Sequence, residues 1–128
     1  MSTAADVPAI TLYTAQTPNG VKVSIALEEL GLAYKVVAVD LAANTQKEPW
    51  FLAINPNGRI PAITDTTGGR ERHVFESGAI LQYLVDTYDV ERKLSYPHGS
   101  DEYWEVLQWV YVSLSLSLSL SLGGGTLT

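Results

Sequence analysis

A carboxylate directly followed by a hydroxyl, at Glu76-Ser77, stands before apolar residues at helical spacing over residues 77–88. Free N–H groups at the start of such a helix favour an anion, and Ser77 is placed to cap it. Glu76 can accept a charge-assisted hydrogen bond from an ammonium group. The pair therefore predicts a site for the charged end of a small zwitterionic peptide. A capping serine beside a solvated glutamate is the plainer explanation, and both stay open.

The stretch Asn57-Gly58-Arg59-Ile60-Pro61 places a proline after a branched apolar residue, at the start of an apolar run. X–Pro bonds adopt the cis form at a cost of about 0.5–1 kcal/mol, against about 3 kcal/mol for other residues. A cis bond here would turn the Ile60 N–H and C=O outward, where they can pair with an extended peptide. A trans proline that opens an edge strand is the alternative.

The turn Thr17-Pro18-Asn19-Gly20 lies between a predicted strand and a predicted helix, where ligands of α/β sheets gather. A ligand thiolate there would receive N–H groups, the helix dipole, and either the Asn19 amide or the Thr17 hydroxyl. Thiol pKa values near 8.5 fall by several units at helix N-termini, and each unit is worth about 1.4 kcal/mol. The alternative is a capping turn in which Asn19 only satisfies the backbone.

Composition narrows the chemistry further. The 128 residues include no cysteine, so a reactive thiol must arrive with the ligand, and disulfides and Cys-based metal sites are excluded. His73 and His98 stand alone, so we expect no metal and no organic cofactor. The net charge of −6 argues against binding to nucleic acid or to an anionic membrane. Because Met1–Pro8 lacks a leader pattern and no run reaches about 20 apolar residues, we expect a cytoplasmic protein.

The elements that must position these residues follow from periodicity and turn residues. A strand, a helix and a second strand within about thirty residues have the size of a βαβ unit, so the two strands should be parallel with a right-handed crossover. A short helix, two antiparallel strands and a longer helix follow. This pattern, together with the family resemblance described below, gives the α/β order βαβ–α–ββα of a thioredoxin-like domain. We expect strands at 9–13, 34–39, 60–64 and 73–75, and helices at 21–30, 49–52 and 77–88.

Outside this domain the sequence predicts shorter segments of different kinds. We expect an N-terminal extension at 1–8, the thioredoxin-like domain at 9–90, a linker and a further helix at 91–112, and a tail at 113–128. The family resemblance described below implies that this further helix is the first of an all-α domain. The predicted helix carries apolar residues that the chain does not obviously cover, which predicts an exposed patch prone to self-association. That patch comprises Tyr103, Trp104, Leu107 and Trp109.

The tail repeats Ser-Leu five times from Ser113 to Leu122. Strict alternation suits a half-buried strand, but no pairing partner is evident. Alternating T and C in a message also encodes Ser-Leu, so we hypothesise a translated repeat tract, such as a retained intron or a misassigned gene end. A genuine but mobile low-complexity tail is the alternative. Sequencing the transcript across codon 112 decides between them, because a mature message encoding the repeat would exclude the gene-assignment explanation.

Three motifs, in this order and at these spacings, resemble the glutathione transferase superfamily over about residues 9 to 112. They are Thr17-Pro-Asn-Gly-Val-Lys, Asn55-Pro-Asn-Gly-Arg-Ile-Pro-Ala-Ile and Glu76-Ser-Gly-Ala-Ile-Leu-Gln-Tyr-Leu. The resemblance is best to the bacterial nu-class enzymes and their fungal relatives, which include the yeast nitrogen-catabolite regulator. It implies glutathione as co-substrate, an electrophile or disulfide as second substrate, and a homodimer in full-length form.

The resemblance also implies roles for particular residues. Thr17 and Asn19 would contact the thiol, and Gln46 the glycyl end. The cysteinyl unit would pair with the Ile60 backbone. The implied glutathione site is completed by Arg59 and Pro61, and by Glu76 and Ser77 at the γ-glutamyl end.

Family members continue into an all-helical second domain, whereas this chain stops within that domain's first helix. The resemblance therefore implies a glutathione transferase, or a glutathione-dependent disulfide oxidoreductase, once a helical domain completes it. A glutathione-binding regulatory module without catalysis, and an inactive fragment, are the alternatives. Turnover of an electrophile separates the first two, and cooperative unfolding separates both from the third.

Overall fold

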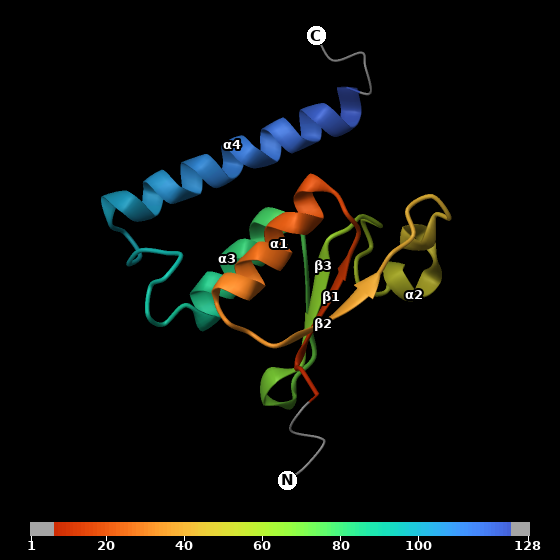
Figure 1. Ribbon diagram of the computed structural model, residues 1–128, viewed down its shortest axis with the longest axis horizontal. Helices are drawn as coiled ribbons and strands as arrows, with labels where there is room; N and C mark the ends of the chain where they lie inside the picture. Colours follow the sequence, from red (N-terminus) through yellow and green to blue (C-terminus); the bar gives the residue numbers. More distant parts are fainter. Residues whose placement is uncertain (1–6, 124–128) are drawn as a thin grey trace.

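The structure is a computed structural model that describes residues 7–123, with side chains through residue 114. Its centre is a four-stranded sheet in the order β2-β1-β3-β4 (Figure 1). β1 pairs with β2 in parallel, whereas β3 pairs with β1 and β4 in the antiparallel sense. The strands are β1 Ile10–Thr14, β2 Tyr34–Ala38, β3 Ala62–Asp65 and β4 Arg72–Phe75.

Helices α1 and α3 cover one face of this sheet, and the short α2 lies on the other side (Figure 1). The arrangement confirms the thioredoxin-like α/β prediction, including the parallel βαβ unit and the antiparallel hairpin. The helices are α1 Pro18–Glu29, α2 Pro49–Leu52, α3 Ser77–Tyr88 and α4 Asp101–Gly123, with 3-10 turns η2 Thr45–Lys47 and η3 Thr67–Gly69.

Strand alternation divides the core into two layers. Leu12 and Ile63 face α1 and α3, where they pack with Leu27 and Leu84 in the larger cluster. Their neighbours along the strands point the other way, because successive side chains of a strand alternate between faces. On that side Ala62 joins a smaller cluster around Phe51 of α2 and Val39.

Two turns next to the sheet differ slightly from the sequence prediction. α1 begins at Pro18 rather than Val21, since proline is well suited to the first helical position and Thr17 caps it. The Ile60–Pro61 bond is cis, and β3 begins only at Ala62. Both shifts leave the predicted site residues at the ends of elements rather than within them.

The Ser-Leu repeat does not form a strand. α4 runs from Asp101 through the repeat to Gly123. The sequence suggested a helix ending near Val112, followed by a translated repeat tract or a mobile low-complexity tail. A helix already nucleated upstream extends readily through leucine, which is a good helix former. Residues 124–128 of that tail lie outside the described part of the chain. None of the helices described within residues 7–123 has the length and apolarity to cross a membrane.

Candidate functional site

A cavity of about 800 Å³ opens where the start of α3, the turn before β3 and one side of α4 meet. Six of the eight predicted site residues line it together. These are Asn19, Arg59, Ile60, Pro61, Glu76 and Ser77. The sequence did not predict the remaining lining residues as members of the site; they are Asn57, Gly78, Ala79, Gln82, Tyr83, Asp86, Leu107, Val110, Tyr111 and Leu114.

Glu76 occupies the capping position of α3, with φ 75° and ψ 120°, and its side chain makes no capping hydrogen bond. Ser77 is therefore the first helical residue and not the cap that the sequence predicted; its side chain is 3% exposed. The correction has a backbone cause, because the positive φ at Glu76 turns the chain into the helix without a capping side chain. The first N–H groups of α3 are then available to an anion at the cavity wall.

The turn before β3 is fixed by a buried amide that sequence reasoning missed. The Asn55 side chain, 1% exposed, donates from Nδ2 to the Arg59 carbonyl (2.7 Å) and accepts at Oδ1 from the Asn57 N–H (2.8 Å). The strand ladder between β1 and β3 ends at Ala62, so Ile60 lies beyond it, on the cavity wall. Its backbone is thus placed where an extended ligand can pair with it. The buried-amide signal was present in the Asn55-Pro-Asn-Gly turn.

The structure separates Thr17 from Asn19. The Thr17 hydroxyl oxygen accepts a hydrogen bond from the Gly20 N–H (3.1 Å) and caps α1, and Thr17 does not line the cavity. Asn19 does line it, and its Oδ1 accepts from Lys22 Nζ (2.9 Å). That bond leaves the amide nitrogen as the donor end of the side chain. Burial lowers the pKa of Lys22.

Gln46 lies outside the cavity, in η2 beside the turn at Gly58. Its Nε2 is 3.4 Å from Asn44 Oδ1, and its buried Oε1 has no hydrogen-bond partner among the described residues. A buried acceptor without a donor is costly, so this oxygen is ready to accept one. The predicted role at the glycyl end of a ligand stays a prediction.

A buried carboxylate beneath the site ties α3 to β3. Asp65, 2% exposed, accepts hydrogen bonds from the hydroxyls of Tyr83 (2.7 Å) and Tyr88 and from the Thr67 N–H (2.9 Å). Burial works to raise the pKa of Asp65, but the bonds from Tyr88, Thr67 and Tyr83 outweigh it and hold that pKa below its usual value. Burial and the bond to Asp65 raise the pKa of Tyr88 to about 12. Tyr83, which faces the cavity, is thereby held in place.

α4 supplies the apolar wall of the cavity. Leu107, Val110, Tyr111 and Leu114 line it, and Leu114 approaches so closely that a Cβ added at Gly78 would lie 2.6 Å from its Cδ1. The sequence predicted exposed apolar residues here, and this is only partly right. Trp104 and Trp109 are 54% and 66% exposed, whereas Tyr103 and Leu107 are half-buried against the rest of the molecule.

Residues 8–86 match the family described as "Glutathione S-transferase, N-terminal domain". Among curated relatives, the chain is 45% identical over 97 residues to "Glutathione S-transferase 1" of Schizosaccharomyces pombe. The match covers 76% of this chain but 42% of that relative, so the chain spans less than half of the relative's length.

Solved structures agree with the sequence match. A glutathione transferase homolog from Lodderomyces elongisporus, with two GSH per subunit, superposes with a TM-score of 0.80 at 49% identity, covering 85% of this chain and 51% of that one. The glutathione transferase URE2P8 from Phanerochaete chrysosporium, with oxidized glutathione, gives a TM-score of 0.83 at 40% identity, covering 89% and 52%. The chain therefore belongs to the glutathione S-transferase family, in its Ure2-like branch, and residues 8–86 are its N-terminal domain.

Proposed function

We propose that this chain binds glutathione in the 800 Å³ cavity and lowers the pKa of its thiol at the Asn19 end. The observation that carries the proposal is that one cavity gathers Glu76, the start of α3, Ile60 and Asn19. Each group matches a different part of the same tripeptide. The glutathione-bound structures of similar proteins support the same ligand.

In this proposal the γ-glutamyl end binds at the start of α3. Its ammonium pairs with the Glu76 carboxylate, and its carboxylate accepts from the free N–H groups that begin at Ser77. The cysteinyl unit pairs with the Ile60 backbone, with Arg59 and Pro61 beside it. This directs the thiol toward Asn19, at the start of α1.

The thiol proton leaves to solvent, and the thiolate accepts a hydrogen bond from the Asn19 amide near the positive end of α1. The sulfur then forms a C–S bond with an electrophile as that substrate's leaving group departs. Alternatively, it attacks a disulfide, forming a new S–S bond and releasing a thiolate. Neither route uses a protein cysteine, a metal or an organic cofactor, and the chain has no cysteine to offer.

The apolar α4 wall is where we place the second substrate. A volume of 800 Å³ is at the upper end of the range for ligand pockets, so a disulfide or an apolar electrophile fits beside the tripeptide. URE2P8 was solved with oxidized glutathione, which is a disulfide. We therefore keep attack on a disulfide beside attack on an electrophile. For the full-length form we propose a cytoplasmic homodimer.

A melting curve with and without millimolar glutathione tests the ligand. At a hundredfold excess over Kd, binding to the native state adds about 2.7 kcal/mol of stability, which raises Tm by roughly 10 °C. Cysteinylglycine, which lacks the γ-glutamyl end, is the matched control and should give little shift. Equal shifts with both compounds would remove the γ-glutamyl site, and no shift with glutathione would remove the function. Turnover of a small aromatic electrophile then separates a catalyst from a binding module.

A further inference from the structure

Asp89 is a buried carboxylate at an unfavourable place. It follows α3 directly as its C-terminal cap and is 4% exposed. The C-terminal end of a helix carries partial negative charge, and the last turn of α3 contains no basic residue to offset it. A carboxylate is costly there unless other donors satisfy it, so its hydrogen bonds indicate what it does.

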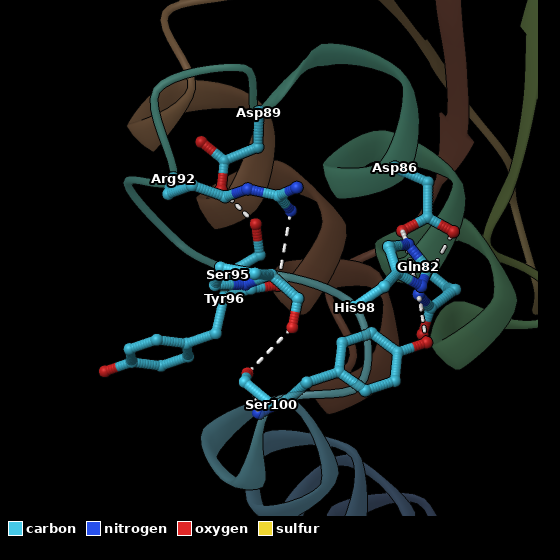
Figure 2. A network of polar contacts seen from close by, with 10 residues as sticks. Gln82, Asp86, Asp89, Arg92, Ser95, Tyr96, His98 and Ser100 are labelled. Atoms are coloured by element: carbon cyan, nitrogen blue, oxygen red, sulfur yellow. Dashed lines mark hydrogen bonds and ion pairs between the residues drawn. The ribbon is translucent and has the colours of Figure 1, made fainter.

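Three donors satisfy this carboxylate, and all three come from the linker between α3 and α4. The N–H of Lys93 donates to Oδ1 (2.7 Å), and the N–H of Leu94 and the hydroxyl of Ser95 donate to Oδ2 (2.9 and 2.6 Å). Figure 2 shows Asp89 and Ser95 in this arrangement, with Arg92 reaching toward Tyr96. Arg92 Nη1 donates to the Tyr96 carbonyl at 3.2 Å.

The linker fixed in this way leads directly into α4. The Ser100 hydroxyl donates to the Pro97 carbonyl (2.7 Å) and accepts from the Tyr103 N–H (3.1 Å), which caps α4. Leu94 and Tyr96 also line a separate cavity of about 150 Å³ together with Val106 and Val110 of α4, so the linker side chains lie next to the helix. Residues 93–96 are therefore in a position to help fix α4, which also packs on α1 and α3.

A second attachment lies on the same side of α3. His98 Nε2 is 3.3 Å from Asp86 Oδ1, and the His98 ring lies against Tyr103 of α4, with centroids 4.7 Å apart. Gln82 Nε2 donates to both Asp86 oxygens (3.0 and 3.1 Å) and is 3.5 Å from the Tyr103 hydroxyl (Figure 2). The ion pair of this attachment is exposed, with the Asp86 and His98 side chains 39% and 60% exposed, whereas Asp89 is buried. Asp89 therefore makes the more strongly shielded attachment.

We propose that Asp89 is a positioning residue, which through the linker holds α4 where its apolar side chains close the second-substrate half of the cavity. The Glu76 half is lined by the start of α3 and the turn before β3, so we expect it to keep its shape when Asp89 is substituted. The assignment of the two halves rests on the proposed function, but the structural claim about α4 does not.

The test compares Asp89→Asn with Glu91→Gln, which removes one charge from an exposed side chain of the same linker. Hydrogen exchange is followed by mass spectrometry, and glutathione affinity by calorimetry. Asp89→Asn should speed exchange at least fivefold at Lys93 and Leu94 and across residues 101–114, while strands β1 and β3 stay protected. Glutathione Kd should stay within twofold, and Glu91→Gln should change neither quantity.

Fast exchange at Lys93 and Leu94 with α4 fully protected would overturn the proposal, because Asp89 would then hold only the linker. Equal acceleration in β1, β3 and α4 would also overturn it, since the effect would be global. Should Asp89→Asn fail to fold, Ser95→Ala is the second variant, because it removes one of the three donors. It must speed hydrogen exchange at least twofold in the same segments, while β1 and β3 stay protected. If the wild-type chain does not bind glutathione, the proposed function is wrong. The hydrogen-exchange comparison would still test the role of Asp89 in holding α4.

Discussion

Glu76 stands in a backbone conformation that side chains rarely adopt, with φ 75° at the wall of the cavity. Such conformations cost about 1–3 kcal/mol and persist where the surrounding structure imposes them. Here the turn frees the helix start from a side-chain cap and brings the carboxylate to the cavity. Glu76 therefore has both a strained backbone and a proposed role in ligand binding. Substitutions can separate the effect of the carboxylate on affinity from the effect of the positive φ on stability.

Glu76→Ala and Glu76→Gly form a matched pair. Both remove the carboxylate, so both should weaken glutathione binding by at least about 1 kcal/mol, as expected for a hydrogen bond to a charged group. Only glycine also relieves the positive φ, so Glu76→Gly should be more stable than Glu76→Ala by roughly 1 kcal/mol. Calorimetry and urea unfolding measure the two quantities. Unchanged affinity in both variants would remove Glu76 from the site.

Asn19 and Thr17 have different positions in the structure, so their substitutions should have different effects. Asn19→Ala should raise the pKa of bound glutathione, read by thiolate absorbance across a pH titration, because the thiolate loses a donor. Thr17→Ala should cost about 1 kcal/mol of stability through the lost helix cap, with little change in that pKa. The opposite result, a pKa raised only by Thr17→Ala, would transfer the thiol role to Thr17.

At the scale of elements, the α1 start is held against the end of β1 by a close backbone approach. A Cβ added at Gly20 would lie 2.3 Å from the Ala15 carbonyl oxygen and 2.4 Å from Thr14 Oγ1. A backbone oxygen cannot rotate aside as a side chain can, so the two segments would have to separate. This contact sets where the Asn19 side chain lies relative to the sheet.

Gly20→Ala should therefore destabilise the fold by about 1–3 kcal/mol, the usual range for overpacking, despite alanine's better helix propensity. Ser24→Ala in the same helix is the control and should be neutral or slightly stabilising. Urea unfolding measures both, and glutathione affinity should fall in Gly20→Ala alone. A stable Gly20→Ala chain would show that the α1 start moves freely.

At the scale of the whole molecule, Asp65 links acid stability to the packing of α3 on the sheet. Its pKa is lower in the folded chain than in the unfolded chain, where it is about 3.9. The stabilisation is thus fully present above about pH 4 and is lost as the pH falls through the folded pKa. Asp65→Asn should cost about 1.5–3 kcal/mol at pH 7 and flatten the acid limb of the stability curve. Asp101→Asn, at an exposed carboxylate, should leave that limb unchanged.

Tyr88 contributes to the loss of stability at alkaline pH, beside Tyr83, whose pKa is also raised by burial and by the bond to Asp65. The pKa of Tyr88 rises from 10.0 to about 12 in the folded chain, so its stabilisation is present below pH 10 and is lost as the pH rises through about 12. Urea unfolding between pH 9 and 12 should therefore show falling stability in the wild type. In Tyr88→Phe the hydroxyl is absent, and this part of the fall should disappear. A fall of the same size in both chains would mean that another group controls it.

How much of this was predictable follows from how local each feature is. Glycine and proline at turns and the spacing of apolar residues predicted the bounds of the strands and helices in residues 9–88 to within a few positions. These signals are local, because turns and amphipathic faces depend on near neighbours. The same rules misassigned Ser77 as a cap, since the positive φ at Glu76 is imposed by the packing around it. They also did not predict a helix through the Ser-Leu repeat, which was interpreted as a translated repeat tract or a mobile tail.

The sequence by itself determined the fold class, the absence of a protein thiol, and most residues of the predicted site, because three local motifs carry them. Only the tertiary structure decided that Asn19 and not Thr17 faces the cavity, that Asp65 and Asp89 are buried, and that α4 supplies a wall. The cavity and the Asp65 contacts join segments distant in the chain. Asp89 is bonded by residues 93–95, which follow it closely but lie in an irregular linker. No local sequence pattern identifies such partners.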